Sequence, residues 1–269
     1  MNYSETYTGI DDLTVSLSDG VLSVTLNRPA SLNSLTAPML ETIGTTLERA
    51  ATDARVRVVL LGGAGRGFSS GAGISEADHA NPGASGTPAD VLAAANRAVR
   101  AIVALPKPVV SVVQGPAAGV GVSLAISADI VLASDKAYFL LAFTKIGLMP
   151  DGGASALVAA AIGRTRAMRL ALLAERLPAA DALAAGLVSA VYPADELDGA
   201  VDQVVATLKS GPAAALRRTK RAINAATLTE LDAAFERETE GQLNLLDSND
   251  FREGTKAFQQ RRPATFTDD

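Results

Sequence analysis

The chain contains no cysteine and only one histidine among its 269 residues. Without cysteine there is no disulfide, no thiolate metal site and no cysteine nucleophile, and the composition fits a reducing compartment. A catalytic dyad or a histidine metal site would have to rest on His79 alone, which stands in an irregular stretch rich in Ala, Asn and Pro. Serines are plentiful, but no histidine partner for one is evident. We therefore expect neither a metal site nor serine-hydrolase chemistry.

Basic charge and long apolar runs are also scarce. The formal net charge is -5, whereas proteins that grip nucleic-acid phosphates present a basic surface. The apolar runs are far shorter than the roughly 20 residues that a membrane helix needs. The first residues, MNYSETYTGIDD, lack the basic segment and apolar stretch of a signal peptide. We expect a soluble, cytoplasmic protein with no nucleic-acid or membrane partner.

Small and aliphatic residues dominate, and their pattern predicts an α/β fold. LTVSL and VLSVTL alternate around Ser18, Asp19 and Gly20, which predicts a β-hairpin, and apolar residues at helical spacing predict a helix from Thr36 to about Ala51. Three aliphatic runs are typical of buried strands in a mostly parallel sheet: RVRVVLLGG, PVVSVV and DIVLAS. A helix is predicted at about 89–105, between the first and the second of them. Beyond residue 155 one strand-like run, GLVSAVY, remains among predicted helices that continue to about residue 262. We expect one α/β core with a helical C-terminal extension.

Two loops of small residues follow predicted strands, GFSSGAGIS and QGPAAGVGVSLA. Such loops let a ligand approach the backbone, and a helix that begins there points free N–H groups outward. Two of them side by side could hold one oxygen atom, although the glycines could equally serve only tight turns and close packing. Neither loop has the spacing of a phosphate-binding P-loop. Residues 75–88 lack periodicity, and we expect a mobile surface loop there.

Three further features have both a structural and a functional interpretation. GLMPDGG places Asp151 between a proline and two glycines, which suits a turn former or an acid–base group. The basic run at residues 216–222 is either a solvated helix face or an aid in neutralising an anionic ligand. Leu243, Leu245, Leu246, Phe251 and Phe258 either pack on their own core or dock on another subunit.

The chain resembles the enoyl-CoA hydratase/isomerase (crotonase) superfamily from about residue 13 to residue 266. The motifs that carry the resemblance occur in order: VTLNRPASLNSLT, FSSGAGIS, KPVVSVVQGPAAGVGVSLAISADIVLAS, FTKIGLMPDGGAS, IGRTRAMRLALLAERLPAADALAAGLVSAVYP and EGTKAFQQRRPATF. The resemblance implies an α/β fold, the crotonase (ClpP-like) spiral of β-β-α units in two nearly perpendicular sheets. It implies a spiral core at residues 1–200 and a helical trimerisation region at 201–269, in trimers that can pair into hexamers.

The resemblance also implies the chemistry. The ligand would be an acyl-CoA thioester, with no cofactor beyond the coenzyme A of the substrate. The thioester oxygen would be held by the backbone N–H groups of Ala72 and Val120, because charge gathers on that oxygen as the thioester becomes enolate-like. The implied substrate and coenzyme A positions are Arg28, Ser70, Gly71, Ile74, Gly119, Phe143, Phe258 and Arg261.

This sequence departs from the hydratase pattern where hydratases of the family carry two glutamates. Those positions are Ser123 and Phe143 here, and phenylalanine can neither take nor give a proton. Gly73 also stands where many relatives have aspartate. The motifs are more similar to the delta-3,delta-2-enoyl-CoA isomerase branch, whose acid corresponds to Asp151. Isomerisation needs only one base, but an aspartate at its usual pKa of about 3.9 is a weak one, so apolar neighbours such as Phe143 would have to raise it.

The sequence alone is therefore compatible with three functions. The first is isomerisation of an enoyl-CoA double bond with Asp151 as the base. The second is hydration through an acid elsewhere, such as Glu76 or Asp78 in the predicted loop. The third is a binding protein that keeps the acyl-CoA pocket without catalysis.

Overall fold

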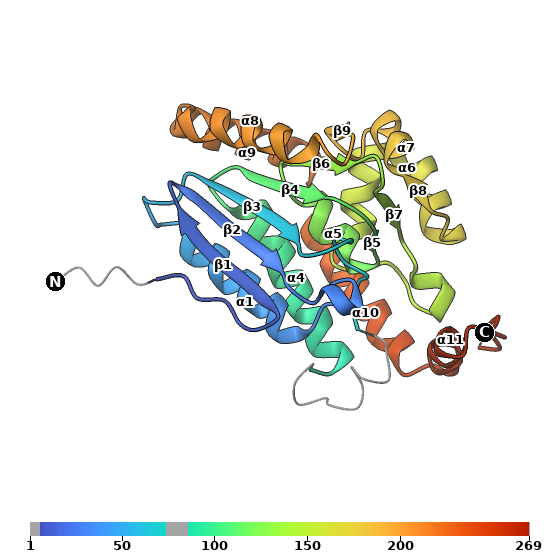
Figure 1. The fold of residues 1–269 in the computed structure, drawn as a ribbon. Coiled ribbons are helices and arrows are strands. Elements are labelled where there is room, and N and C mark those ends of the chain that lie inside the picture. The colour runs from blue at the N-terminus through green and yellow to red at the C-terminus, as the bar shows by residue number, and fades with distance from the viewer. Residues whose placement is uncertain (1–5, 74–85, 269) are drawn as a thin grey trace.

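The computed structural model describes residues 6–73 and 86–268, so Ile74, Glu76, Asp78 and His79 lie outside the described residues. Figure 1 shows the arrangement of the elements. The strands are β1 Leu13–Ser18, β2 Val21–Leu26, β3 Val58–Gly63, β4 Val109–Val113, β5 Ala117–Ala118, β6 Ile130–Ser134, β7 Tyr138–Leu140, β8 Leu177–Pro178 and β9 Ala190–Tyr192. The helices are η1 Pro29–Ser31, α1 Ala37–Ala50, α4 Pro88–Ala104, α5 Val120–Ile126, η2 Phe143–Ile146, α6 Ala154–Leu173, α7 Ala179–Ala185, α8 Leu197–Ser210, α9 Ala213–Thr227, α10 Leu231–Leu246 and α11 Asn249–Gln259.

The predicted hairpin is present as β1 and β2, which pair antiparallel from Leu13 opposite Leu26 to Ser18 opposite Val21. Its two-residue turn has positive φ at both Asp19 and Gly20, the geometry that matches the twist of a hairpin. The predicted helix follows as α1, where the Thr36 side chain accepts a hydrogen bond from the backbone N–H of Met39. Both local predictions are confirmed.

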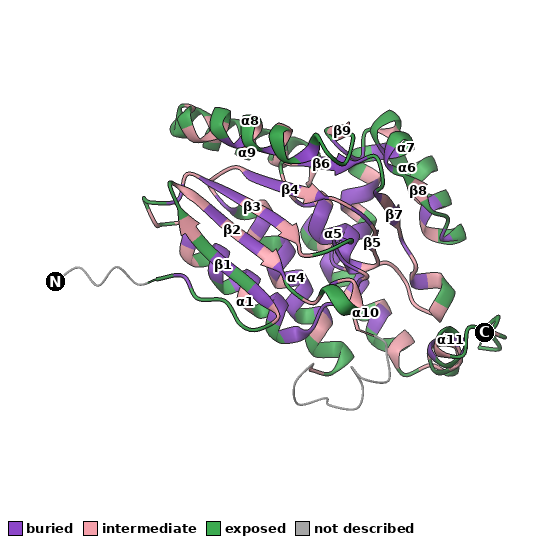
Figure 2. Cartoon of the chain, viewed as in Figure 1, coloured by how far each residue is buried: buried purple, intermediate pink, exposed green. Residues whose placement is uncertain are grey.

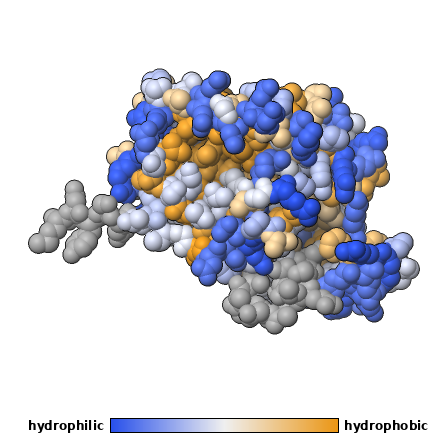
Figure 3. Space-filling view, viewed as in Figure 1, coloured by the Kyte–Doolittle hydropathy of each residue, from blue (hydrophilic) through white to orange (hydrophobic). Residues whose placement is uncertain are grey.

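The main sheet has the strand order β1-β2-β3-β4-β6-β9, and every pair after the first hairpin is parallel. Its central strands send alternate residues to opposite faces. In β3, Val59 and Leu61 join the large core beneath α1 and α4, whereas Val58 and Leu60 join a smaller cluster beneath α8. Figure 2 shows the central strands as largely buried, and Figure 3 shows apolar side chains gathered on the sheet face below α8. The sheet is therefore a middle layer between helices.

A second sheet has the order β5-β7-β8 and stands beside α5. Sequence patterning did not predict β7 and β8, because strands of three and two residues are too short to show a period. The C-terminal part is otherwise helical, as expected, and α6 is interrupted at Gly163. The α/β core with its helical extension is thus confirmed. Among the described residues, no helix is long and apolar enough to cross a membrane.

Candidate functional site

The site is organised by the turn that contains Asp151, between η2 and α6. Gly152 and Gly153 both have positive φ, 65° and 79°, a region that glycine enters without penalty. A Cβ at position 152 would lie 3.0 Å from Cγ2 of Val120 in α5, and one at position 153 would lie 2.8 Å from Cδ1 of Leu231 in α10. The two glycines therefore let the turn fit between α5 and α10. This explains why the local sequence is typical of a turn.

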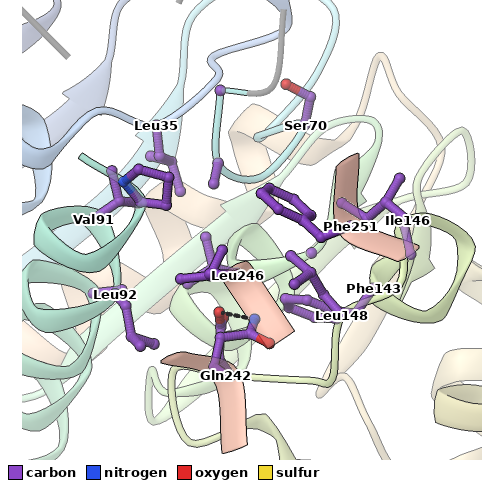
Figure 4. A pocket seen from close by; sticks show the side chains of 18 of the residues that line it. Leu35, Ser70, Val91, Leu92, Phe143, Ile146, Leu148, Gln242, Leu246 and Phe251 are labelled. Atoms are coloured by element: carbon purple, nitrogen blue, oxygen red, sulfur yellow. Dashed lines mark hydrogen bonds between the residues drawn. The ribbon is translucent and has the colours of Figure 1, made fainter. Parts of the chain in front are cut away.

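The two carboxylate oxygens of Asp151 have different surroundings. Oδ2 accepts a hydrogen bond of 2.7 Å from Nε2 of Gln242 in α10, marked by the dashed line in Figure 4. Oδ1 has no accessible surface and no hydrogen-bond partner among the described residues, although the residue as a whole keeps some exposure and lines the cavity. A buried polar atom without a partner is costly and rare in folded proteins. Oδ1 is therefore the carboxylate oxygen whose hydrogen-bonding capacity no described residue satisfies.

Burial raises the pKa of Asp151 from 3.8 to about 7. The hydrogen bond from Gln242 lowers the pKa, because it stabilises the ionised form, and the negative charge of Glu238 raises it. The apolar surroundings that a catalytic aspartate would need are thus present. The cavity wall includes Phe143 and Leu148. A carboxyl group with a pKa near 7 exchanges a proton readily at neutral pH.

The two small-residue loops lie side by side, as the sequence suggested. Ser69 pairs with Ala117 in a parallel bridge, and a Cβ at Gly71 would lie only 2.8 Å from the carbonyl oxygen of Ala118. Glycine at position 71 is required for this approach, so this predicted site residue stands where the loops meet. Gly119, from the second loop, lines the cavity.

Ala72 and Val120 line the same cavity as Asp151. The bridge between Leu35 and Ala72 uses the carbonyl of Gly71 and the N–H of Gly73, which leaves the N–H of Ala72 without a partner among the described residues. Val120 is the first residue of α5, so its N–H has no partner within the helix. The residues that carry these two N–H groups and the unpaired carboxylate oxygen thus line one cavity.

Apart from Ser70 and Gln242, the rest of the cavity wall is formed by apolar residues and glycine. Figure 4 shows side chains from α4, η2, α10 and α11 around it. The apolar lining residues are Leu35, Pro88, Val91, Leu92, Ala95, Ala142, Phe143, Ile146, Leu148, Leu246 and Phe251. Leu246 and Phe251 therefore contribute to this cavity. Asp151 is the one acid among its described lining residues.

The two positions that carry glutamate in hydratases have structural roles here. Ser123 is fully buried, and its hydroxyl donates a hydrogen bond of 2.8 Å to the backbone carbonyl of Asp151. Phe143 is 7% exposed and lines the cavity. A serine that holds the turn and a phenylalanine that covers the wall provide no second acid–base group.

The remaining predicted residues are distributed over a wider area. Ser70 lines the cavity and donates to the carbonyl of Ser31. Arg28 is not among the lining residues, and its guanidinium donates to the carbonyl and the hydroxyl of Ser34. Phe258 is 61% exposed, and Arg261 is exposed with positive φ beyond the end of α11. The predicted oxyanion and acid residues therefore line one cavity. Arg28, Phe258 and Arg261 are not among the described residues that line it.

One serine matches a hydrolase pattern, G-x-S-x-G, in the string GFSSG. It is Ser69, which is fully buried. Its hydroxyl donates to the carbonyl of Asn33 and accepts from the N–H of Gly71. Ser69 thus fixes the first loop and does not present a nucleophile.

Two residues of α10, Glu238 and Gln242, were not singled out from the sequence. Both are buried, with 0% and 1% exposure. They continue the buried stripe of Leu231, Ala234 and Phe235 at helical spacing. A polar pair four residues apart on an apolar stripe is the signal that could have found them, because buried polar groups need partners.

Comparisons with known proteins show which family the chain belongs to. The family model described as enoyl-CoA hydratase/isomerase matches residues 16–269. A 1,2-epoxyphenylacetyl-CoA isomerase of Escherichia coli is 38% identical over 92% of this chain and 95% of its own length. A trans-2-decenoyl-[acyl-carrier-protein] isomerase of Streptococcus mutans is 33% identical over 95% of this chain and 98% of its own.

Among solved structures, an enoyl-CoA hydratase from Mycobacterium avium subsp. paratuberculosis is 64% identical, with a TM-score of 0.90 over 97% of this chain and 100% of that one. An enoyl-CoA hydratase/isomerase from Pseudoalteromonas atlantica is 34% identical, with a TM-score of 0.83 over 95% of this chain and 100% of that one. The likeness extends over the whole spiral and its helical extension. The chain therefore belongs to the enoyl-CoA hydratase/isomerase family and has the crotonase fold.

Proposed function

We propose that this enzyme shifts the double bond of a 3-enoyl-CoA to the conjugated 2-position, with Asp151 as the only acid–base group. The observation that carries the proposal is the unpaired, buried Oδ1 of Asp151 in a cavity that contains no other described acid. With a pKa of about 7, the carboxyl is present in both its ionised and its protonated form at neutral pH. Such a group can both accept a proton and return it.

The reaction needs one base because a single proton moves. Oδ1 of Asp151 removes a proton from the alpha carbon, and the electron pair of that C–H bond spreads into a dienolate. The negative charge gathers on the thioester oxygen, which the N–H groups of Ala72 and Val120 stabilise. Each such donor contributes roughly 2.7–4 kcal/mol in comparable sites. The carboxyl then returns the proton to the gamma carbon, and the conjugated thioester results.

The apolar wall supports this assignment over hydration. Water addition requires a group that holds and activates a water molecule beside the beta carbon. Ser123 is committed to the carbonyl of Asp151, and Phe143 has no polar atom to offer. Coenzyme A is part of the substrate, so the proposed reaction uses no separate cofactor.

The decisive assay supplies purified protein with 3-hexenoyl-CoA and follows the absorbance of the conjugated thioester. We expect turnover by the wild type and a loss of about 10²- to 10⁴-fold in kcat for Asp151→Asn. Asp232→Asn is the matched control, because Asp232 is an exposed acid in the first turn of α10. Absence of turnover by the wild type, or full turnover by Asp151→Asn, would overturn the proposal. Hydration of crotonyl-CoA would favour the hydratase, and tight binding of acyl-CoA without chemistry would favour the binding protein.

We further propose that residues 201–269 form the trimerisation region and that Phe258 and Arg261 reach coenzyme A. Support comes from α9, which contacts the rest of the chain through Lys220 and Asn224 but has no other strongly buried side chain and leaves Ile223 57% exposed. A helix of this length with so little apolar burial in the single chain is typical of a surface that another subunit covers. Light scattering coupled to size-exclusion chromatography tests the assembly, and a monomer would contradict it. Arg261→Ala should raise KM for acyl-CoA and leave kcat unchanged.

A further inference from the structure

Four hydrogen bonds connect α10 to the turn that carries Asp151. Oε1 of Gln242 accepts from the backbone N–H of Met149 at 3.1 Å, and Nε2 donates to Oδ2 of Asp151. Four residues earlier, Oε2 of Glu238 accepts from the N–H of Gly153 at 2.6 Å, and Oε1 accepts from the N–H of Ser155 at 2.8 Å. One face of α10 thus holds the chain on both sides of Asp151.

The orientation of the Gln242 amide is fixed by its two neighbours. The N–H of Met149 can only donate, so the carbonyl oxygen of the amide must face it. The NH₂ group then faces Oδ2 of Asp151, which can only accept when ionised. Gln242 is 1% exposed, so water does not compete for either bond.

From this geometry we infer that Gln242 and Glu238 are positioning residues, each of which acts on the base Asp151 in a different way. Gln242 occupies Oδ2 and leaves Oδ1 as the single proton-transfer atom, while Glu238 fixes the turn and opposes ionisation of Asp151. The inference rests on the proposed isomerase function, because it assigns the control of the same carboxyl group.

The two residues act on Asp151 in opposite directions. The hydrogen bond from Gln242 lowers the pKa of Asp151, and the charge of Glu238 raises it. The other elements around Asp151 contribute uncharged cavity residues: Val120 from α5, Phe143 from η2 and Phe251 from α11. Glu238 is therefore the one charged group among the described residues whose field contributes to the pKa of Asp151.

Backbone N–H groups surround the carboxylate of Glu238 and stabilise its ionised form. Its carboxylate stands at the first residues of α6, where backbone N–H groups and the positive end of the helix favour an anion. Burial raises the pKa of Glu238 above its usual value, against the hydrogen bonds from Ser155 and Gly153 and the charge of Arg237, which lower it. The anion is thus stabilised by N–H groups that belong to the turn it supports.

The test measures kcat/KM for 3-hexenoyl-CoA against pH in the wild type, Gln242→Met and Glu238→Gln. The base must be ionised, so activity falls below its pKa. Removal of the hydrogen bond in Gln242→Met should move this acid limb upward by about one pH unit. Loss of the charge in Glu238→Gln should move it downward. We expect the acid limbs of the two variants to shift in opposite directions. A purely structural disturbance would lower activity in both variants without such opposite shifts.

Two additions keep the test decisive if one variant is unstable. Gln242→Glu keeps the size of the side chain and adds a second carboxyl beside Oδ2, so its limb should also move upward. Exchange of the alpha hydrogens of hexanoyl-CoA in deuterium oxide reports the same proton transfer without isomerisation. Unshifted limbs in these variants, with an active wild type and an inactive Asp151→Asn, would overturn this inference alone. An inactive wild type would instead overturn the proposed function.

Discussion

Replacement of Asp151 by asparagine should stabilise the protein at alkaline pH even as it removes the base. Burial raises the pKa of this carboxyl from 3.8 to about 7, so the folded state holds a proton that the unfolded state releases. Because the pKa of this acid is higher in the folded than in the unfolded state, the group favours folding most at pH values below 3.8. This contribution is lost as pH rises from 3.8 through 7. Above pH 7 the folded protein must carry the poorly solvated charge.

The magnitude follows from the pKa values. Each pKa unit corresponds to about 1.36 kcal/mol, so ionisation of Asp151 in the folded state costs roughly 4 kcal/mol in full. Between pH 5 and pH 8 the linkage relation gives about 2–3 kcal/mol of this cost. Asparagine has nearly the same shape and no charge. Its side-chain oxygen can still accept the hydrogen bond from Gln242.

The assay is urea unfolding of the wild type and Asp151→Asn at pH 5, 6, 7 and 8, at one protein concentration because assembly alters apparent stability. The difference in unfolding free energy between the two proteins cancels the titration of all other groups. We expect this difference to move in favour of the variant by about 2–3 kcal/mol from pH 5 to pH 8. A difference that stays constant with pH would refute the reasoning, since the carboxyl would then titrate alike in both states.

Two further substitutions test the backbone of the Asp151 turn and an ion pair elsewhere in the fold. Gly152→Ala should cost about 1–3 kcal/mol of unfolding free energy, because position 152 has a φ of 65°; the control Gly199→Ala, in α8 with open space around the new Cβ, should not destabilise. Lys220→Met should cost about 1.5–3 kcal/mol, because it removes the ammonium that lies 2.9 Å from the partly buried Asp129 carboxylate and leaves that carboxylate only the N–H of Val109. The exposed pair of Arg169 should contribute at most about 1 kcal/mol when Arg169→Met removes it. Urea unfolding measures all four, and equal losses for the buried and exposed pairs would contradict the argument.

The sequence predicted those parts of the fold that local patterns determine. The hairpin, α1 and the buried strands β3, β4 and β6 have either a period or a cap that is visible in a few consecutive residues. The short strands β7 and β8 exist because their partners offer hydrogen bonds. Pairing of this kind between distant segments leaves no local pattern to read.

The site, like the fold, has parts that the local sequence predicts and parts that it does not. The small-residue loops and the PDGG turn were visible as candidates because glycine and proline mark unusual backbone geometry. The partner of Asp151 was not visible, because Gln242 lies 91 residues away and meets it only after α10 packs on the core. A polar residue on an apolar helical stripe shows that a buried partner exists, but local sequence does not identify that partner.

The loss of two acids and the raised pKa of the third are linked physically. A carboxylate at position 143 would bring charge and water into the cavity that Phe143 now covers, and a carboxylate at position 123 would replace the hydroxyl that holds the carbonyl of Asp151. Water would solvate Asp151 and lower its pKa, so apolar replacement preserves the burial that makes one aspartate a useful base at neutral pH. A largely apolar cavity with one described acid suits a reaction that returns the proton it removes, whereas hydration needs a further group to activate a water molecule. The same substitutions that oppose hydration therefore support the proposed isomerisation.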